Sequence, residues 1–130
     1  MNIVDSSGWL EFFADGPNAA FFAPAIQKPG DLLVPTISIY EVFKRILQQK
    51  EETDALRAVA AMQQGSVMPL DEALALSAAR LSLQAKLPMA DSIMLAAART
   101  TGSTLWTQDK DFEGIGGIRY VEASKNRMGA

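Results

Sequence analysis

The sequence has 130 residues, a net charge of −3 and a pI of about 4.9, with neither cysteine nor histidine. The length fits one compact domain, and the acidic balance argues against a general nucleic-acid binder with a broad basic surface. The missing residue types exclude disulfides, thiolate zinc sites, cysteine nucleophiles and histidine bases, so hydrolysis would have to rest on carboxylates, a metal ion or a lysine.

The first half of the chain alternates short apolar runs with amphipathic segments, separated by turn-forming residues. In chain order, the predicted elements are a strand at 2–5, a helix opening at 6–8, a helix at about 17–27, a strand at 31–34 and a helix beginning at Ser38. The last helix is the best defined, because Ile39, Val42, Phe43 and Ile46 recur at the spacing of one buried helical face.

The second half continues the same alternation. In chain order, the predicted elements are a helix at 52–64, a strand at 66–70, a helix from Asp71 to Pro88, a helix at 89–101 and strands at 103–107 and 118–121. The run 93–98 is apolar on every side, so its helix should be deeply packed, with Gly102 as its C-cap. We expect one domain over residues 1–122 and a flexible tail at 123–130.

Strands that alternate with helices predict an α/β fold, with a parallel sheet and helices on both faces. Functional sites of such folds gather at the carboxyl ends of the strands. Asp5 ends the first predicted strand and Asp109 follows the fourth. Glu41 is expected in the first turn after the second strand, and Asp91 begins the helix that leads into the fourth. The four acids should therefore converge on one edge.

Four converging carboxylates favour a bound cation. Two unit charges about 4 Å apart repel by roughly 4 kcal/mol at an effective dielectric constant near 20. Oxygen ligands suit a hard ion such as Mg²⁺ or Mn²⁺, which can activate water and stabilise a phosphate transition state. Such a site would supply hydrolysis without a histidine.

Each acid alone also has an ordinary structural interpretation. Asp5 fits a helix cap or a turn residue. Glu41 fits a capping box with Ser38 or an i, i+4 pair with Arg45. Asp91 fits the positive N-terminus of a helix, and Asp109 fits a turn cap. The whole set on one edge is much less expected by chance than any single member.

The chain resembles the PIN domain family, and the VapC toxins in particular, in four ordered blocks. The blocks are Ile3–Ser7 with Trp9–Phe13, Ile39–Val42, Leu87–Ala98 and Leu105–Phe112. Their order and spacing agree over residues 2–121. The resemblance implies a five-stranded parallel sheet and a Mg²⁺- or Mn²⁺-dependent endoribonuclease. Its catalytic residues would be Asp5, Glu41, Asp91 and Asp109.

The resemblance also implies roles for individual residues. The residues that it places at the metal are Asp5, Asp91 and Asp109, with Glu41 and Asp111 as further candidates. Ser7 and Thr107 match small hydroxyl positions that support the acids. Trp106 departs from the family pattern, which has a small β-branched residue there, and core packing is a better interpretation of it than base stacking.

VapC-like proteins are homodimers that cut structured RNA, such as tRNA or rRNA, and are inhibited by a cognate antitoxin protein. The resemblance implies these partners here. Lys44, Arg45, Arg99 and Lys110 lie in segments near the predicted edge and are the candidates for RNA binding, although ordinary solvated charges explain each of them equally well. No stretch approaches about 20 apolar residues and the N-terminus lacks signal-peptide features, so we expect a cytoplasmic protein without a membrane partner.

Two other phosphate-chemistry folds also place acids at strand ends, and both fit poorly. A receiver domain needs an acidic pair after the first strand and a lysine near the end of the fifth, where this chain has Arg119 and Tyr120. A haloacid-dehalogenase-type phosphatase needs Asp-x-Asp, and position 7 is serine. The alternatives that stay open are a solitary PIN nuclease without an antitoxin and a non-catalytic PIN-like interaction module.

Overall fold

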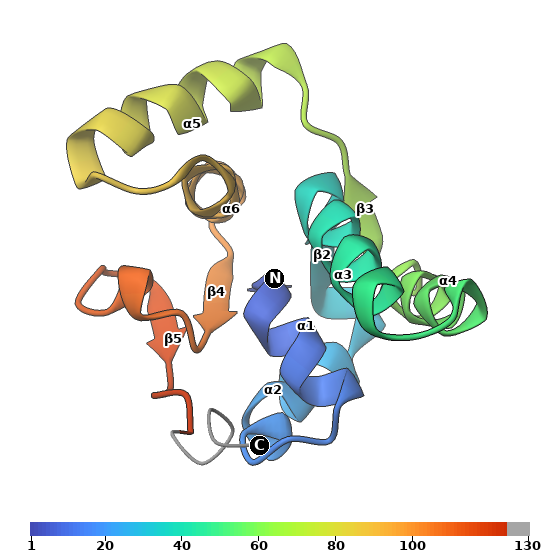
Figure 1. Ribbon diagram of the computed structural model, residues 1–130. Coiled ribbons are helices and arrows are strands. Elements are labelled where there is room, and N and C mark those ends of the chain that lie inside the picture. The colour runs from blue at the N-terminus through green and yellow to red at the C-terminus, as the bar shows by residue number, and fades with distance from the viewer. Residues whose placement is uncertain (125–130) are drawn as a thin grey trace.

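The computed structural model describes residues 1–124, which form a parallel sheet between two sets of helices (Figure 1). The strands are β1 (Asn2–Val4), β2 (Leu32–Pro35), β3 (Ser66–Met68), β4 (Thr104–Thr107) and β5 (Ile118–Tyr120). The helices are α1 (Ser6–Phe13), α2 (Ala19–Ile26), α3 (Thr36–Gln49), α4 (Glu52–Met62), α5 (Glu72–Ala85) and α6 (Met89–Thr101), with 3-10 turns η1 (Pro29–Asp31) and η2 (Lys110–Phe112). The predicted α/β fold is confirmed, whereas most of the predicted tail at 123–130 lies outside the described residues.

The five strands are all parallel and lie in the order β3-β2-β1-β4-β5, so β1 is central. It pairs with β2 on one side and with β4 on the other, where Val4 lies opposite Trp106. Neighbouring parallel strands end at the same edge of a sheet. The residues after β1 and β4 therefore meet, although 102 positions separate Asp5 from Thr107.

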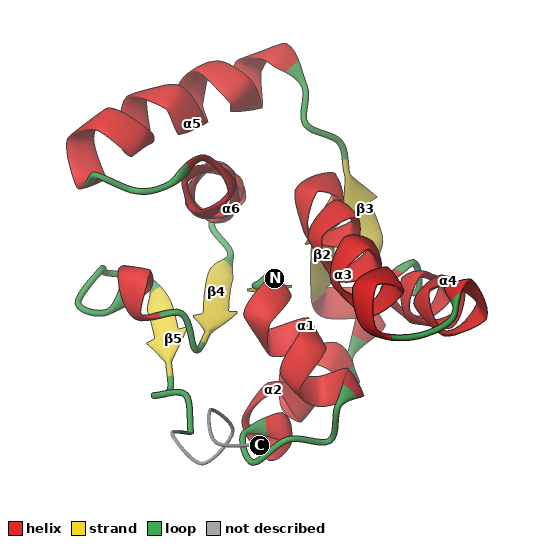
Figure 2. Cartoon of the chain, viewed as in Figure 1, coloured by secondary structure: helices red, strands yellow, loops and turns green. Residues whose placement is uncertain are grey.

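Helices cover both faces of the sheet (Figure 2). One buried cluster joins α5 and α6 to one face of the sheet. A second cluster joins the four helices α1, α2, α3 and α4 to the opposite face. The predicted deep packing of α6 is confirmed, because every residue from Ser92 to Ala98 is buried. Asp91 precedes this run, so the packing of α6 fixes where its carboxylate lies.

The start of α3 differs from its prediction. The helix begins at Thr36, directly after Pro35 at the end of β2, and not at Ser38. The Ser38 hydroxyl donates a hydrogen bond to the Pro35 carbonyl oxygen at 2.7 Å, so Ser38 caps nothing. The expectation that Glu41 lies in the first turn was therefore wrong: the chain passes from strand to helix without a loop, and Glu41 falls in the second turn.

Two other helix ends agree with the sequence. The Asp71 carboxylate accepts a hydrogen bond from the Leu74 N–H at 2.9 Å and caps α5. Gly102 ends α6 in the left-handed conformation, with a φ of 65°. The longest helices, α3 and α5, have 14 residues each, and within residues 1–124 none is long and apolar enough to cross a membrane.

Substituting Gly8 by alanine is expected to lower the melting temperature, because α1 approaches β1 and α2 closely at this residue. A Cβ there would lie 2.6 Å from the Phe22 ring and 2.7 Å from Val4. Overpacking of this kind costs about 1–3 kcal/mol, which is several degrees for a domain of this size. Thermal denaturation followed by circular dichroism measures the change. Gly30→Ala is the control, since a Cβ there meets no atom within 4 Å, and equal melting temperatures for the two variants would contradict this packing.

Candidate functional site

Asp5 lies at the carboxyl end of β1, where its side chain is only 3% exposed. It occupies the N-cap position of α1 but makes no side-chain cap hydrogen bond. Its Oδ2 atom instead accepts hydrogen bonds from the hydroxyls of Ser7 and Thr107, each at 2.9 Å. Burial raises the pKa of Asp5 to about 6 although these two hydroxyls lower it, and the charges of Asp109 and Glu41 raise it further.

Asp109 is held beside Asp5 by the end of β4. Its backbone N–H donates to the Thr107 hydroxyl oxygen at 2.9 Å, so one hydroxyl connects the backbone of Asp109 to the carboxylate of Asp5. The Oδ1 atom of Asp109 accepts a hydrogen bond from the Asp111 N–H at 2.9 Å and caps η2. The turn-cap interpretation of Asp109 thus accounts for one of its two oxygens.

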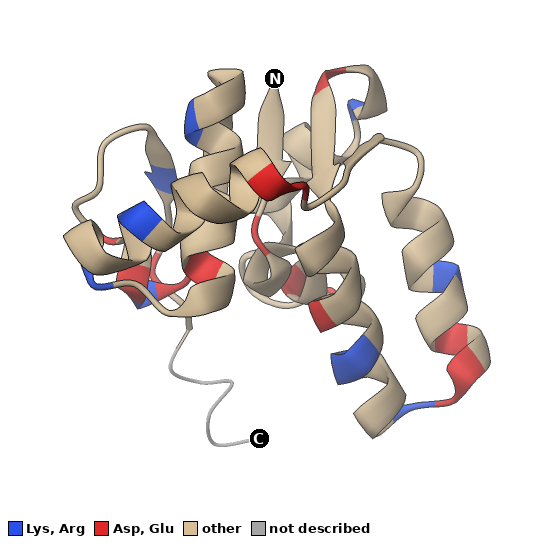
Figure 3. Cartoon of the chain, turned by 90° about the horizontal axis from the view of Figure 1, so that it is seen from above, with Lys and Arg blue, Asp and Glu red and all other residues tan. Residues whose placement is uncertain are grey.

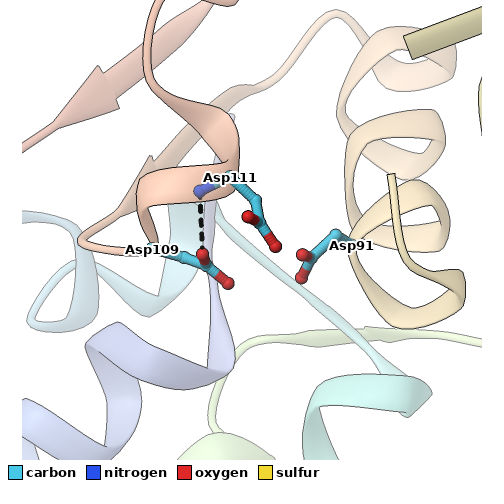
Figure 4. Close-up of side chains that lie close together, drawn as sticks. All are labelled: Asp91, Asp109 and Asp111. Carbon is cyan, nitrogen blue, oxygen red and sulfur yellow. Dashed lines mark hydrogen bonds between the residues drawn. The ribbon is translucent and has the colours of Figure 1, made fainter. Parts of the chain in front are cut away.

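Asp91 faces Asp109 and Asp111 from the first turn of α6 (Figure 4). Each of the three residues offers a carboxylate oxygen within 4.8 Å of the others. Burial, followed by the charges of Asp109 and Asp5, raises the pKa of Asp91 to about 8. The raised pKa reflects burial first and then repulsion from the other acids, and a divalent cation bound between the carboxylates would favour their ionised form.

Glu41 reaches the same edge from the second turn of α3. Its Oε1 atom accepts a hydrogen bond from the Ser6 hydroxyl at 2.6 Å, which ties α3 to the start of α1. Within residues 1–124 no salt bridge joins Glu41 to Arg45. Neither ordinary interpretation of Glu41, as a capping-box residue or as the partner of Arg45, describes this arrangement.

One pocket of about 300 Å³ brings the predicted acids together. Its lining residues are Asp5, Ser6, Ser7, Leu10, Glu41, Arg45, Asp91 and Asp109. We call it the acid pocket. Asp111 does not line it but lies beside two of its members. The side-chain atoms of the pocket that could bind a metal ion are carboxylate and hydroxyl oxygens. Such ligands fit a hard divalent cation such as Mg²⁺ or Mn²⁺.

The four candidate RNA-binding cations are spread over different places, and Lys and Arg residues are scattered over several helices and loops (Figure 3). Arg45 lines the acid pocket. Lys44 lies over the Tyr40 ring, with its Nζ atom 5.6 Å from the ring centroid, and Lys110 is exposed in η2. Arg99 lies in the last turn of α6, at the opposite end of that helix from Asp91.

Trp106 is a core residue, which confirms the prediction of core packing over base stacking. Its side chain is 8% exposed and its ring lies 5.4 Å from that of Phe21, between centroids. The indole N–H donates to Asn2 Oδ1 at 2.9 Å. Both the ring and its polar atom are therefore used within the fold.

Three polar residues near the acid pocket were missed at the level of sequence. Ser6 contacts Glu41, and its place directly after Asp5 was the available signal. The Gln108 side chain is buried, and its Oε1 atom accepts a hydrogen bond from Asn18 Nδ2 at 3.0 Å. Asn18 also donates to the Glu122 carbonyl oxygen at 3.0 Å. No spacing rule connects positions 18, 108 and 122, because only the tertiary fold brings them together.

The same fold occurs in solved structures of known proteins. A toxin–antitoxin complex from Klebsiella pneumoniae matches with a TM-score of 0.78 and 22% identity, over 91% of this chain and 95% of that one. VapC20 from Mycobacterium tuberculosis matches at 0.77 and 17% identity, over 92% and 98%. The DNA-bound VapBC of Salmonella typhimurium matches at 0.72 and 14% identity, over 93% and 96%. At these identities the likeness shows the fold alone.

Sequence comparisons give the family. A search of curated protein sequences finds no match. The family model of the PIN domain matches residues 3–118, which extend from β1 to the first residue of β5 and include every acid of the pocket. The chain therefore belongs to the PIN domain family.

Proposed function

We propose that this protein is a metal-dependent endoribonuclease that cleaves structured RNA, either tRNA or rRNA, and that it is the toxin of a type II toxin–antitoxin pair. The observation that carries the proposal is the convergence of Asp5, Glu41, Asp91 and Asp109 in one pocket of a protein without histidine or cysteine. Membership of the PIN domain family supports it. So does the similarity in fold to VapC20, which is described as a toxin that cleaves the sarcin-ricin loop.

The cofactor in this proposal is Mg²⁺ or Mn²⁺. Asp5, Asp91 and Asp109 would hold the ion, with Glu41 and Asp111 close enough to complete its surroundings. A bound ion of this kind lowers the pKa of water and stabilises the charge that develops on a phosphate. The carboxylate oxygens are the only anionic groups that the pocket offers for these tasks.

The chain's own residues would orient the reaction. The hydroxyls of Ser7 and Thr107 fix the Oδ2 atom of Asp5, and its Oδ1 atom would be available to the ion. The Ser6 hydroxyl fixes one oxygen of Glu41, and the other can position a water molecule for attack on the phosphate. The guanidinium of Arg45, at the same pocket, can bind a phosphate oxygen.

The proposed partners are a cognate antitoxin and a second copy of the chain. Two of the structures with this fold are complexes of a toxin with its antitoxin. Large apolar side chains are exposed on four helices, and a homodimer would cover some of them. They are Tyr40 and Leu47 on α3, Leu56 on α4, Leu76 and Leu83 on α5 and Met89 on α6. The proposed place of action is the cytoplasm, where tRNA and ribosomes are the targets.

Partner-free protein incubated with total tRNA and rRNA is expected to give discrete fragments with Mg²⁺ or Mn²⁺ and none with EDTA. Asp91→Asn should reduce the cleavage rate by about 100-fold or more, because losing one anionic ligand removes several kcal/mol of transition-state stabilisation. Asp31→Asn is the matched control, since Asp31 is exposed in η1 and lies outside the acid pocket. Cleavage that persists in EDTA, or an Asp91→Asn protein as active as the control, would contradict the proposal.

The stability of the metal-free protein should fall as the pH rises from about 5 to about 8. The pKa values of Asp5 and Asp91 are about 6 and about 8 in the folded protein, against about 3.9 for an unfolded aspartate. The folded state therefore holds more protons than the unfolded state in this range, so raising the pH favours unfolding.

Melting temperatures measured in EDTA across this range test the pH dependence, and added Mg²⁺ should restore most of the loss near pH 8. In Asp91→Asn the dependence on pH should be shallower and the response to Mg²⁺ small. A melting temperature that rises with pH would contradict the raised pKa values of these carboxyl groups, and equal responses to Mg²⁺ in both proteins would contradict a metal site at Asp91.

A further inference from the structure

A second and larger hollow adjoins the acid pocket. It has a volume of about 510 Å³ and lies between α1, the second half of α3 and α4. We call it the helical groove; its principal lining residues are Leu10, Phe13, Arg45, Ile46, Lys50 and Arg57. Ser7, Leu10 and Arg45 line both hollows, so the groove continues directly from the acid pocket.

The groove carries three cationic side chains that form no ion pair within residues 1–124. Arg45, Lys50 and Arg57 are exposed, and none forms a salt bridge with any residue in 1–124. One acid, Asp54, also lines the groove. Its Oδ2 atom accepts a hydrogen bond from the Glu51 N–H at 3.3 Å, as part of the capping box that starts α4. Three cations without an ion-pair partner in this part of the chain thus lie beside the acid pocket of a protein whose net charge is −3.

An RNA strand meets opposite charges at these two hollows. Phosphates that flank the scissile bond are repelled by the carboxylates of the acid pocket, so binding needs cations on the path that leads away from it. The lining of the groove also includes three partly buried apolar residues, Leu10, Phe13 and Ile46. Cations that track a backbone, together with an apolar or aromatic surface for the bases, form the usual combination in proteins that bind single strands.

We propose that the helical groove holds the single-stranded stretch of RNA next to the scissile phosphate. Arg45, Lys50 and Arg57 contact its phosphates, and the bases lie against Leu10 and Phe13. This proposal rests on the proposed ribonuclease function. It also explains how an acidic protein binds RNA without a broad basic surface, since three of its cations lie together along one groove. A protein segment is the competing occupant, but the three unpaired cations on the path from the acid pocket favour the nucleic acid.

The test compares two double variants that each replace one lysine and one arginine. Lys50→Gln with Arg57→Gln alters the groove, and Lys28→Gln with Arg80→Gln removes the same charge from exposed positions outside both hollows. Each is made in the Asp91→Asn background to prevent cleavage. The probe is a fluorescein-labelled unstructured RNA of about 12 nucleotides, and its affinity is measured by fluorescence anisotropy over a range of KCl concentrations.

In the groove double variant, the negative slope of log affinity against log salt should become shallower by about 1.4, because each lost phosphate contact on a single strand removes about 0.7. The control double variant should keep the slope of its parent. Equal slopes in the two double variants, or no measurable RNA binding by the parent, would overturn the proposal and leave the groove to a protein segment. Circular dichroism spectra identical to the parent's exclude misfolding as the cause of a change.

Kinetics with an intact acid pocket separate this proposal from the proposed function. With bulk tRNA as substrate, the groove double variant should show a raised KM and a nearly unchanged kcat, because contacts to flanking phosphates act on ground state and transition state alike. An unchanged KM would count against the groove while leaving the nuclease function in place. Absence of any metal-dependent cleavage by the wild-type protein would be a failure of the proposed function, and the anisotropy measurement does not depend on it.

Discussion

The hydroxyl of Thr107 donates a hydrogen bond to Asp5 and accepts one from the N–H of Asp109, and the rest of the site depends on this link. It exists because β1 and β4 are neighbouring parallel strands whose register sets Val4 opposite Trp106. Asp91 on α6 and Glu41 on α3 lie at the same edge of the sheet as these two strand ends. The sheet order β3-β2-β1-β4-β5 is therefore the structural cause of the acid pocket.

Such a pocket opposes folding when no cation is bound, and the molecule compensates by packing. The pKa values of Asp5 and Asp91 are raised by burial and by neighbouring carboxylates, so ionising these groups destabilises the fold. The helix that carries Asp91 is buried along its whole middle, from Ser92 to Ala98. Strong packing of α6 can thus hold a side chain in a position that its own electrostatics disfavour. If the protein is the proposed metal-dependent nuclease, this arrangement prepares its site for a divalent ion before one binds.

Much of the fold could be predicted from local patterns, and the failures have identifiable physical causes. The bounds of α6 agree with the prediction because Pro88 precedes the helix and Gly102 ends it. The start of α3 was placed too late, because a strand that ends in proline can pass directly into a helix. The convergence of the acids followed from the rule for parallel strand ends. Lys50 and Arg57 were not foreseen as groove residues, since their neighbourhood depends on how α3 and α4 pack against α1.

The central claim is that Asp5, Asp91 and Asp109 hold a divalent cation. Crystals grown with Mn²⁺ test it most directly, because anomalous scattering locates the metal independently of any assumed chemistry. The account predicts a strong anomalous peak in the acid pocket, within coordination distance of carboxylate oxygens from at least two of these residues, and its loss in Asp91→Asn crystals. A well-ordered pocket without such a peak, at Mn²⁺ concentrations that support cleavage, would contradict the account.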